Sequence, residues 1–278
     1  MDLIRNQFFI GFCINFILIY IFCRIPLMTK SGWVSAGILG TILWGCLSWQ
    51  GWMSVVIYLL FGSLVTKIGF KFKKAQGIAE KRGGRRGPEN VWGSAATGLF
   101  LAIMTKFNAA NVVMFKVGFA ASFAAKLADT FGSEIGKRFG KDTYLITSLK
   151  KVDRGTEGGI SIEGTLASVL GSIFMAFIML RLSIISTKYH FIVVVVSGFL
   201  ATLSESIIGA KFQNKYKLSN ELVNAIQTSI ASVFAILLLF YIHIFLINNI
   251  WKDLRFLPFC ENLPAFKSLE KPEMTFGI

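Results

Sequence analysis

Long apolar segments separated by short polar connections dominate the order of residues in this chain. Most of these segments match the length of a membrane-crossing helix, which needs roughly 17–25 residues. They lie near 7–23, 31–49, 52–69, 92–105, 109–128, 161–181, 190–208 and 222–248. Unbroken apolar runs of this kind are typical of helices and not of the alternating strands of a membrane barrel. The pattern therefore predicts an all-α, polytopic transmembrane helical bundle with about 7–8 spans.

The composition supports an integral membrane protein. Hydrophobic residues make up 54% of the chain and charged residues 16%, whereas soluble domains carry about 25% charged residues. The first apolar segment lacks a small-residue cleavage site, so we expect a first span there and not a removed signal peptide. We expect one integral membrane domain over residues 1–250 and a C-terminal tail over 251–278.

The charged residues gather in alternate connections. Residues 67–91 hold eight basic and two acidic residues, and residues 126–163 hold seven and six. With eight spans, both segments fall on the same side as residues 209–221, and the positive-inside rule predicts that this side is cytoplasmic. Topology thus accounts for the net charge of +14. Because no basic segment is interleaved with aromatic residues, we expect no nucleic-acid partner.

The concentration of polar residues at one face bears on function. We expect the active-site loops at about 67–92, 126–163 and 205–224. A transporter usually places polar groups near the bilayer midplane. A single polar face instead favours an enzyme whose substrate has a polar head in the cytosol and a tail in the lipid.

The segment KLADTFGSEIGK, residues 126–137, carries the densest cluster of charge beside a span. Wound as a helix, it places Lys126, Asp129, Thr130, Ser133 and Lys137 on one face, with Glu134 at its margin. Carboxylates are ligands that Mg²⁺ uses together with substrate phosphates, and lysines stabilise phosphate as point charges. The alternative is an ordinary helix end that enters water with salt bridges. The segment is not a P-loop, because three residues separate its glycines and Arg138 follows the lysine.

Three further segments contain groups that suit phosphate binding. The glycine-rich segment 150–165 combines backbone N–H groups that can approach an anion with the guanidinium of Arg154. Residues 81–93 place arginines before a span, and topology alone also explains them. In residues 205–229, polar side chains enter a span, where they usually face the bundle interior. The candidates are Arg85, Arg86, Asn90, Gly155, Thr156, Gly158, Gly159, Ser161, Thr165, Glu205, Asn220 and Asn224.

Taken together, these segments resemble a known membrane family. Four stretches are similar in sequence and in order to the motifs of the family that contains transmembrane protein 19 and phytyl-phosphate kinase. They are KLADTFGSEIGK, DRGTEGGISIEGTLAS, SESIIGA and LSNELVNAIQTS. The segment around Arg85, Arg86 and Asn90 resembles an earlier block of that family, although Trp92–Gly93–Ser94 departs from it. The resemblance covers roughly residues 30–245.

The resemblance implies a reaction. Phytyl-phosphate kinase adds a second phosphate to phytyl monophosphate, and the diphosphate serves tocopherol and phylloquinone synthesis and phytol salvage. Similarity to polyprenol kinases implies CTP as the nucleoside triphosphate. The residues themselves do not select phytyl over another isoprenyl monophosphate.

A mechanistic hypothesis assigns roles to the candidate residues. Asp129 and Glu134 hold Mg²⁺, while Lys126, Lys137 and Arg154 act on the transferred phosphoryl group. The nucleotide phosphates are bound by Arg85, Arg86, Gly155, Thr156, Gly158, Gly159, Ser161 and Thr165. The lipid phosphate is bound by Asn90, Glu205, Asn220 and Asn224. Two alternatives stay open: a membrane transporter or carrier without catalysis, and a cytidylyltransferase that acts on a lipid phosphate.

Overall fold

The computed structural model describes residues 2–255, so most of the predicted tail, 251–278, lies outside the described residues. The chain forms two compact units, Met1–Ile236 and Leu237–Ile278. The α-helices are α1 Asp2–Phe22, α2 Lys30–Lys67, α3 Phe70–Ala75, α4 Pro88–Phe107, α5 Val112–Phe139, α6 Ile162–Arg181, α7 Lys188–Ile208, α8 Asn214–Tyr216 and α9 Asn220–Arg255. Short 3₁₀ turns cover η1 Lys81–Gly84 and η2 Ala109–Asn111, and a π-helical segment, η3, covers Gly209–Gln213.

Several of these helices suit a bilayer. Within the described residues, five helical stretches are long and apolar enough to cross a membrane, and Asn6–Phe22 is a shorter apolar helix. The five are Lys30–Lys67, Ala109–Phe139, Ile162–Arg181, Lys188–Tyr216 and Asn220–Phe245. The predicted class, a polytopic transmembrane helical bundle, is confirmed.

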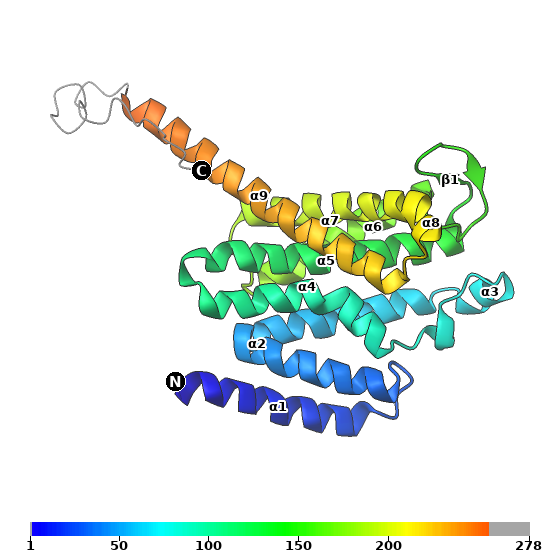
Figure 1. Ribbon diagram of the computed structural model, residues 1–278, viewed down its shortest axis with the longest axis horizontal. Helices are drawn as coiled ribbons and strands as arrows, with labels where there is room; N and C mark the ends of the chain where they lie inside the picture. The colour runs from blue at the N-terminus through cyan, green and yellow to red at the C-terminus, as the bar shows by residue number, and fades with distance from the viewer. Residues whose placement is uncertain (1, 256–278) are drawn as a thin grey trace. The chain divides into compact units, whose positions relative to one another are not determined.

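Helix α2 reverses direction at Ser48, whose backbone leaves the helical region with φ 56° and ψ −165°. Figure 1 shows its two arms lying side by side in opposite directions. The predicted connection between the second and third spans falls at this reversal. Trp44 and Trp52, one on each arm, donate to Gln7 and Asn15 of α1 at 3.1 and 3.0 Å, which fastens α1 to the pair.

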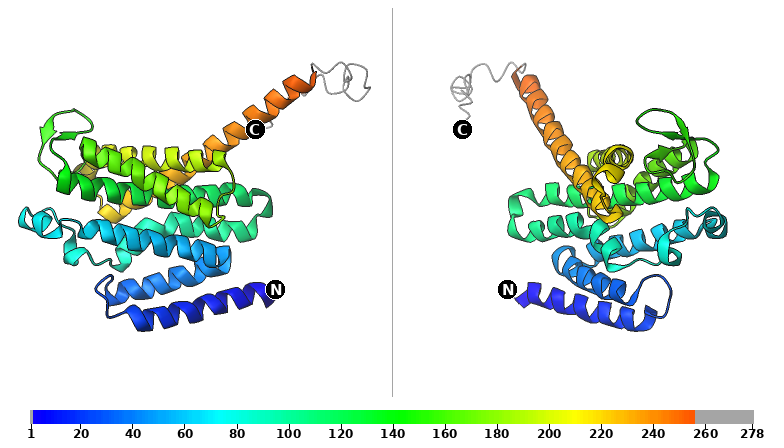
Figure 2. Two further views of the ribbon diagram at one scale, coloured as in Figure 1. Left: turned by 180° about the vertical axis from the view of Figure 1, so that it is seen from behind. Right: turned by 45° about the vertical axis from the view of Figure 1, so that its right-hand side comes forward.

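The polar connections of the first unit emerge at one end of the bundle. The turn before α2, the segment around α3, the loop that carries β1 and the segment around α8 all lie at the right of Figure 1, and the reversed view of Figure 2 agrees. The sequence prediction that these segments share one face is therefore reproduced. Whether that face is cytoplasmic stays a prediction.

Helix α5 is the central element of the first unit. The side chains of Phe119, Phe123 and Leu127 are fully buried. On the side facing α6, the site of a Cβ on Gly164 lies 2.8 Å from the Gly132 carbonyl oxygen, so the two backbones touch. Small residues permit this close approach between membrane helices. Helix α5 continues without a break to Phe139, which carries the predicted polar face out of the apolar region.

Two local features differ from the sequence expectation. Helix α4 begins at Pro88 and not near residue 92, because Pro88 suits the first helical position and the Asn90 side chain accepts from the Gly87 N–H at 2.9 Å. A small antiparallel sheet interrupts the otherwise helical fold, with strand order β2-β1-β3. Its strands are β1 Thr143–Leu145, β2 Lys151–Val152 and β3 Gly159–Ile160.

Candidate functional site

A cavity of about 690 Å³ opens among the polar connections of the first unit. Its lining comes from the ends of α4, α5, α6, α7 and α9 and from two loops, residues 77–86 and 155–161. Most of the lining side chains are polar or charged. A polar cavity of this size can accommodate phosphate groups of a nucleotide or lipid, and pockets of about 300–1,000 Å³ are typical of small-molecule sites.

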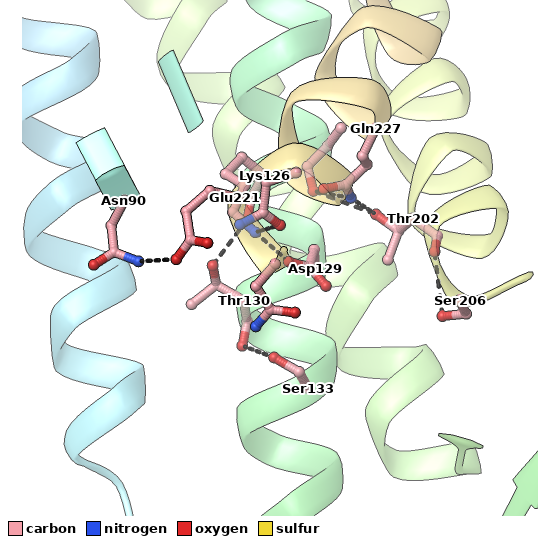
Figure 3. Close-up of polar contacts among 12 residues, drawn as sticks. Asn90, Lys126, Asp129, Thr130, Ser133, Thr202, Ser206, Glu221 and Gln227 are labelled. Carbon is pink, nitrogen blue, oxygen red and sulfur yellow. Dashed lines mark hydrogen bonds and ion pairs between the residues drawn. The ribbon is translucent and has the colours of Figure 1, made fainter. Parts of the chain in front are cut away.

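Lys126 lies in the deep part of this cavity. Its ammonium group forms an ion pair with Asp129, three residues further along α5, and donates to the Asn224 amide oxygen of α9 at 2.8 Å. The residue is 6% exposed, so the charge is held in a largely dry environment. Because a buried ammonium is stable only when paired or hydrogen-bonded, Asp129 and Asn224 fix its position. Figure 3 shows Lys126 and Asp129 facing one another.

Gln227 of α9 contacts the backbone of α5 next to Lys126. Its side chain is fully buried and donates to the Ala125 carbonyl at 3.2 Å and to the Thr202 hydroxyl at 3.3 Å. The sequence analysis did not single out Gln227 or Thr202. The helical spacing of Asn220, Asn224 and Gln227 is the signal that identifies Gln227, because residues three or four apart share a helix face.

A second group of polar side chains closes the cavity on the side of α4. Asn90 donates to Glu221 of α9 at 3.4 Å and accepts from Arg82 at 3.1 Å, and Figure 3 shows Asn90 and Glu221 facing one another. Arg86 donates to the Tyr58 hydroxyl of α2 at 2.9 Å. An isolated tyrosine in an apolar span gives no sequence signal for this role.

The glycine-rich segment forms the opposite wall. Gly155 and Gly158 adopt left-handed backbones, with φ 84° and 74°, which residues with a Cβ rarely adopt. A Cβ on Gly158 would also lie 2.5 Å from the Ser206 carbonyl oxygen of α7. Ser161 then caps α6 by accepting from the Gly164 N–H at 3.1 Å. The first turn of α6 thus faces the cavity, and helix N-termini favour anions.

Glu157 lies on this wall outside the spans. Glu157 is an exposed residue of the cavity lining; partial desolvation of its carboxyl raises the pKa of Glu157, the Lys137 ammonium opposes this change, and the nearby carboxylates Asp129 and Glu80 reinforce it. Asp142 shows the opposite effect in the adjoining loop, because its hydrogen bond and ion pair with Lys151 lower the pKa of the Asp142 carboxyl.

Glu134 faces away from Asp129 and toward α3. It forms a buried ion pair with Lys73, and Lys73 also donates to the Thr66 carbonyl at 2.9 Å. Lys73 is fully buried. The sequence placed Lys73 among many basic residues of a connection, so nothing distinguished it from its exposed neighbours.

The structure brings nearly all predicted site residues together. Every candidate except Arg154 lines the cavity, and the lining candidates are Arg85, Arg86, Asn90, Lys126, Asp129, Glu134, Lys137, Gly155, Thr156, Gly158, Gly159, Ser161, Thr165, Glu205, Asn220 and Asn224. Arg154 is not among the lining residues. It lies near Asp142, where its charge adds to that of Lys151.

The donor set suits Mg²⁺ only if substrate completes the coordination. Among residues 6–245, whose side chains are described, no cluster of three or more His, Cys, Asp or Glu residues has the arrangement of a metal site. Mg²⁺ is commonly bound through one or two carboxylates together with substrate phosphates. Asp129 and Glu205 both line the cavity, and they are near enough to interact electrostatically. The residues present therefore fit a metal that arrives with a nucleotide.

The fold and the cavity define the class of this protein: a polytopic integral membrane protein with a cation-bearing polar cavity at one end of its bundle. The chain belongs to the DUF92 family of integral membrane proteins, whose model matches residues 13–232. The family resemblance inferred from the sequence motifs is confirmed.

Individual relatives agree with this assignment. The chain is 46% identical over 212 residues to an uncharacterized membrane protein of Synechocystis sp., covering 76% of this chain and 82% of the relative. It is 44% identical over 217 residues to "Protein VTE6, chloroplastic" of Arabidopsis thaliana, covering 76% of this chain and 65% of that longer relative. A membrane protein of Methanocaldococcus jannaschii is 29% identical over 236 residues, covering 80% and 93%. No solved structure matches the chain.

Proposed function

We propose that this protein is an isoprenoid lipid kinase that transfers the terminal phosphoryl group of CTP to phytyl phosphate. The observation that carries the proposal is the buried Lys126 ammonium, fixed by Asp129 and Asn224 at the deep end of a polar cavity. A fixed cation in a dry site stabilises phosphate charge more strongly than one in water. The resemblance to the phytyl-phosphate kinase family supports the choice of lipid and nucleotide.

The reaction requires positioning and charge neutralisation more than acid–base chemistry. An oxygen of the lipid phosphate attacks the terminal phosphorus of the nucleotide. The bond between that phosphorus and its bridging oxygen then breaks, and CDP leaves with the electron pair. The acceptor is already an anion, so no strong general base is needed. Positioning and electrostatics supply most of the catalysis in such transfers.

Different residues of the cavity neutralise charge and position the two substrates. Lys126 and Lys137 offset the charge of the transferred group, while Asn220 and Asn224 orient the lipid phosphate. The backbone of Gly155–Gly159 and the first turn of α6 hold the nucleotide phosphates, with Arg85 and Arg86 opposite them. Asp129, together with the nucleotide phosphates, would hold Mg²⁺, and the ion would neutralise phosphate charge there.

The test is an assay of the purified protein in detergent with magnesium. Phytyl phosphate is offered with CTP and, separately, with ATP, and the products are identified by mass spectrometry. We expect phytyl diphosphate and CDP, and we expect Asp129→Asn to abolish both. Asp142→Asn is the matched control, because Asp142 is a carboxylate outside the cavity.

Other products would point elsewhere. Pyrophosphate and a CDP-lipid would identify a cytidylyltransferase that uses the same nucleotide-binding groups. The absence of any product with every isoprenyl monophosphate and both nucleotides would overturn the kinase proposal in favour of a carrier.

A further inference from the structure

Residues 77–86, here called the basic wall, form one side of the cavity without regular helix. The basic wall contributes Lys81, Arg82, Arg85 and Arg86 to the lining. Arg82, Gly83 and Gly84 have positive φ angles of 54°, 68° and 80°. In its middle, Arg82 makes exposed contacts with Glu89 and Asn90 of α4, so the more buried contacts that hold the segment in place are those at its two ends.

The C-terminal end of the basic wall is fastened through Arg86. Its N–H donates to the Leu27 carbonyl at 3.1 Å, and its own carbonyl accepts from the Thr29 N–H at 3.0 Å. Its guanidinium donates to the Tyr58 hydroxyl at 2.9 Å. Helix α4 begins two residues later at Pro88, so this end is joined to the bundle on several sides.

The N-terminal end is fastened through α3. The Ile78 N–H donates to the Lys73 carbonyl at 3.0 Å, and the Lys73 side chain forms its buried ion pair with Glu134 of α5. Phe72, the neighbour of Lys73, lies under the Arg138 guanidinium at 4.7 Å. A weaker ion pair joins Glu80 to Lys137 at 3.8 Å. Lys73–Glu134 is the one fully buried contact of this set among the described residues.

We infer that Glu134 is a positioning residue which, through Lys73, holds the basic wall against the nucleotide. The sequence analysis assigned Glu134 to Mg²⁺ because it is a carboxylate at the margin of the helix face that carries Asp129, and the residue does line the cavity. The structure shows the Glu134 side chain 3% exposed and paired with a fully buried ammonium, whereas the Asp129 side chain, although paired with Lys126, is 16% exposed and so remains open to a further ligand. The inference deepens the proposed function and relies on it for the kinetic measurement alone.

The energetics of buried ion pairs allow a direct test of this inference. Removal of one partner leaves an uncompensated buried charge, whereas replacement of both partners by apolar residues of similar volume is often tolerated. We would compare Lys73→Met, Glu134→Gln and the double variant Lys73→Met/Glu134→Leu in the full-length protein. Lys74→Met is the matched control, because Lys74 is an exposed lysine of the same helix.

Two measurements report on the basic wall. Trypsin cleavage after Lys81, Arg82, Arg85 and Arg86, followed by mass spectrometry, measures local opening and requires no activity. Each single variant should be cleaved there roughly tenfold faster, and its KM for the nucleotide should rise by a similar factor while kcat changes less. The double variant should recover both values to within about threefold of the wild type, with an unchanged magnesium requirement.

Other outcomes would overturn the inference. Loss of activity in Glu134→Gln with unchanged cleavage, while Lys73→Met stays active, would make Glu134 a ligand of the metal or substrate. A double variant that is cleaved like the wild type but keeps the raised KM of Glu134→Gln would show that Glu134 acts on the nucleotide directly and not through the basic wall. If the single variants do not fold, Phe72→Ala removes the neighbouring contact of α3 with Arg138 of α5 without unpairing a buried charge, and unchanged cleavage there would count against α3 as the anchor of the basic wall. A wild type without kinase activity would refute the proposed function and leave the cleavage test intact.

Discussion

Asn224 of α9 accepts a hydrogen bond from the buried ammonium of Lys126 on α5, with 2.8 Å between the two atoms. The residues are 98 positions apart in the chain, so this contact depends on the packing of the bundle. Lys126 is also paired with Asp129 on its own helix. The cation is therefore held from two directions, which limits where a phosphate can meet it.

Loss of the Asn224 side chain should impair catalysis more than folding. We expect Asn224→Ala to lower kcat/KM by about 10–100-fold, because a hydrogen bond to a charged group contributes about 1.5–3 kcal/mol. Steady-state kinetics with phytyl phosphate and CTP measures this change. The apparent melting temperature should also fall, because the same hydrogen bond stabilises the fold, but the protein should still fold since Asp129 pairs with Lys126.

Asn214→Ala serves as the control for that variant. Asn214 is an exposed amide that does not line the cavity, so its removal should leave kcat/KM unchanged. Equal losses in the two variants would show that Asn224 has no specific role.

The raised pKa of Glu157 predicts how stability depends on pH. Partial desolvation of the carboxyl of this exposed residue is the main cause; the Asp129 and Glu80 carboxylates act in the same direction and Lys137 opposes them. A carboxyl whose folded pKa is raised favours the folded state below its unfolded pKa of about 4.5 and loses that contribution as pH rises. Glu157→Gln should therefore melt at a higher temperature than the wild type near pH 8, and the difference should shrink toward pH 4.5.

Asp142→Asn provides a control of opposite sign. Pairing with Lys151 lowers the pKa of Asp142, so its contribution to stability is present at neutral pH and is lost in acid. The variant should melt slightly below the wild type at pH 8 and approach it as the pH falls. A Glu157→Gln variant with the same sign as Asp142→Asn would refute the argument from desolvation of the Glu157 carboxyl.

The sequence predicted the helices of the bundle and nearly all of the candidate cavity residues because each rests on a local pattern. Apolar length identified the helices, and helical spacing placed Lys126, Asp129 and Lys137 on one face of α5. The order of the spans and the charge of their connections then predicted that the glycine-rich segment and Asn224 lie at the same end of the bundle.

The sequence could not identify which ionic partner each charge would take. Glu134 follows Asp129 closely enough to suggest a shared metal, yet its partner is Lys73 from another helix. The pairing of Glu134 with Lys73 depends on how α3 packs against α5. The residue spacing within either segment does not predict that packing. Arg154 does not line the cavity for a related reason: the small sheet of β1–β3 sets the direction of this segment, and no residue pattern in the sequence predicts those strands.

The glycine-rich wall should not tolerate a side chain at Gly158. Gly158→Ala places a Cβ in a left-handed backbone, which costs about 1–3 kcal/mol, and brings it within 2.5 Å of the Ser206 carbonyl oxygen. We expect a lower apparent melting temperature and a raised KM for the nucleotide. Gly83→Ala is the control, because Gly83 has a similar φ of 68° but no atom within 4 Å of the added Cβ. Equal effects would assign the penalty to backbone strain and not to packing against α7.

The reversal of α2 at Ser48 should become more stable with glycine. Ser48 combines φ 56° with ψ −165°, a region that residues with a Cβ avoid at a cost of about 1–3 kcal/mol. Glycine removes that strain and loses about 0.5–1 kcal/mol through its greater freedom in the unfolded chain. Ser48→Gly should therefore raise the apparent melting temperature, whereas Ser204→Gly, within helix α7, should lower it. A decrease in both variants would mean that the Ser48 backbone is not strained in the folded protein.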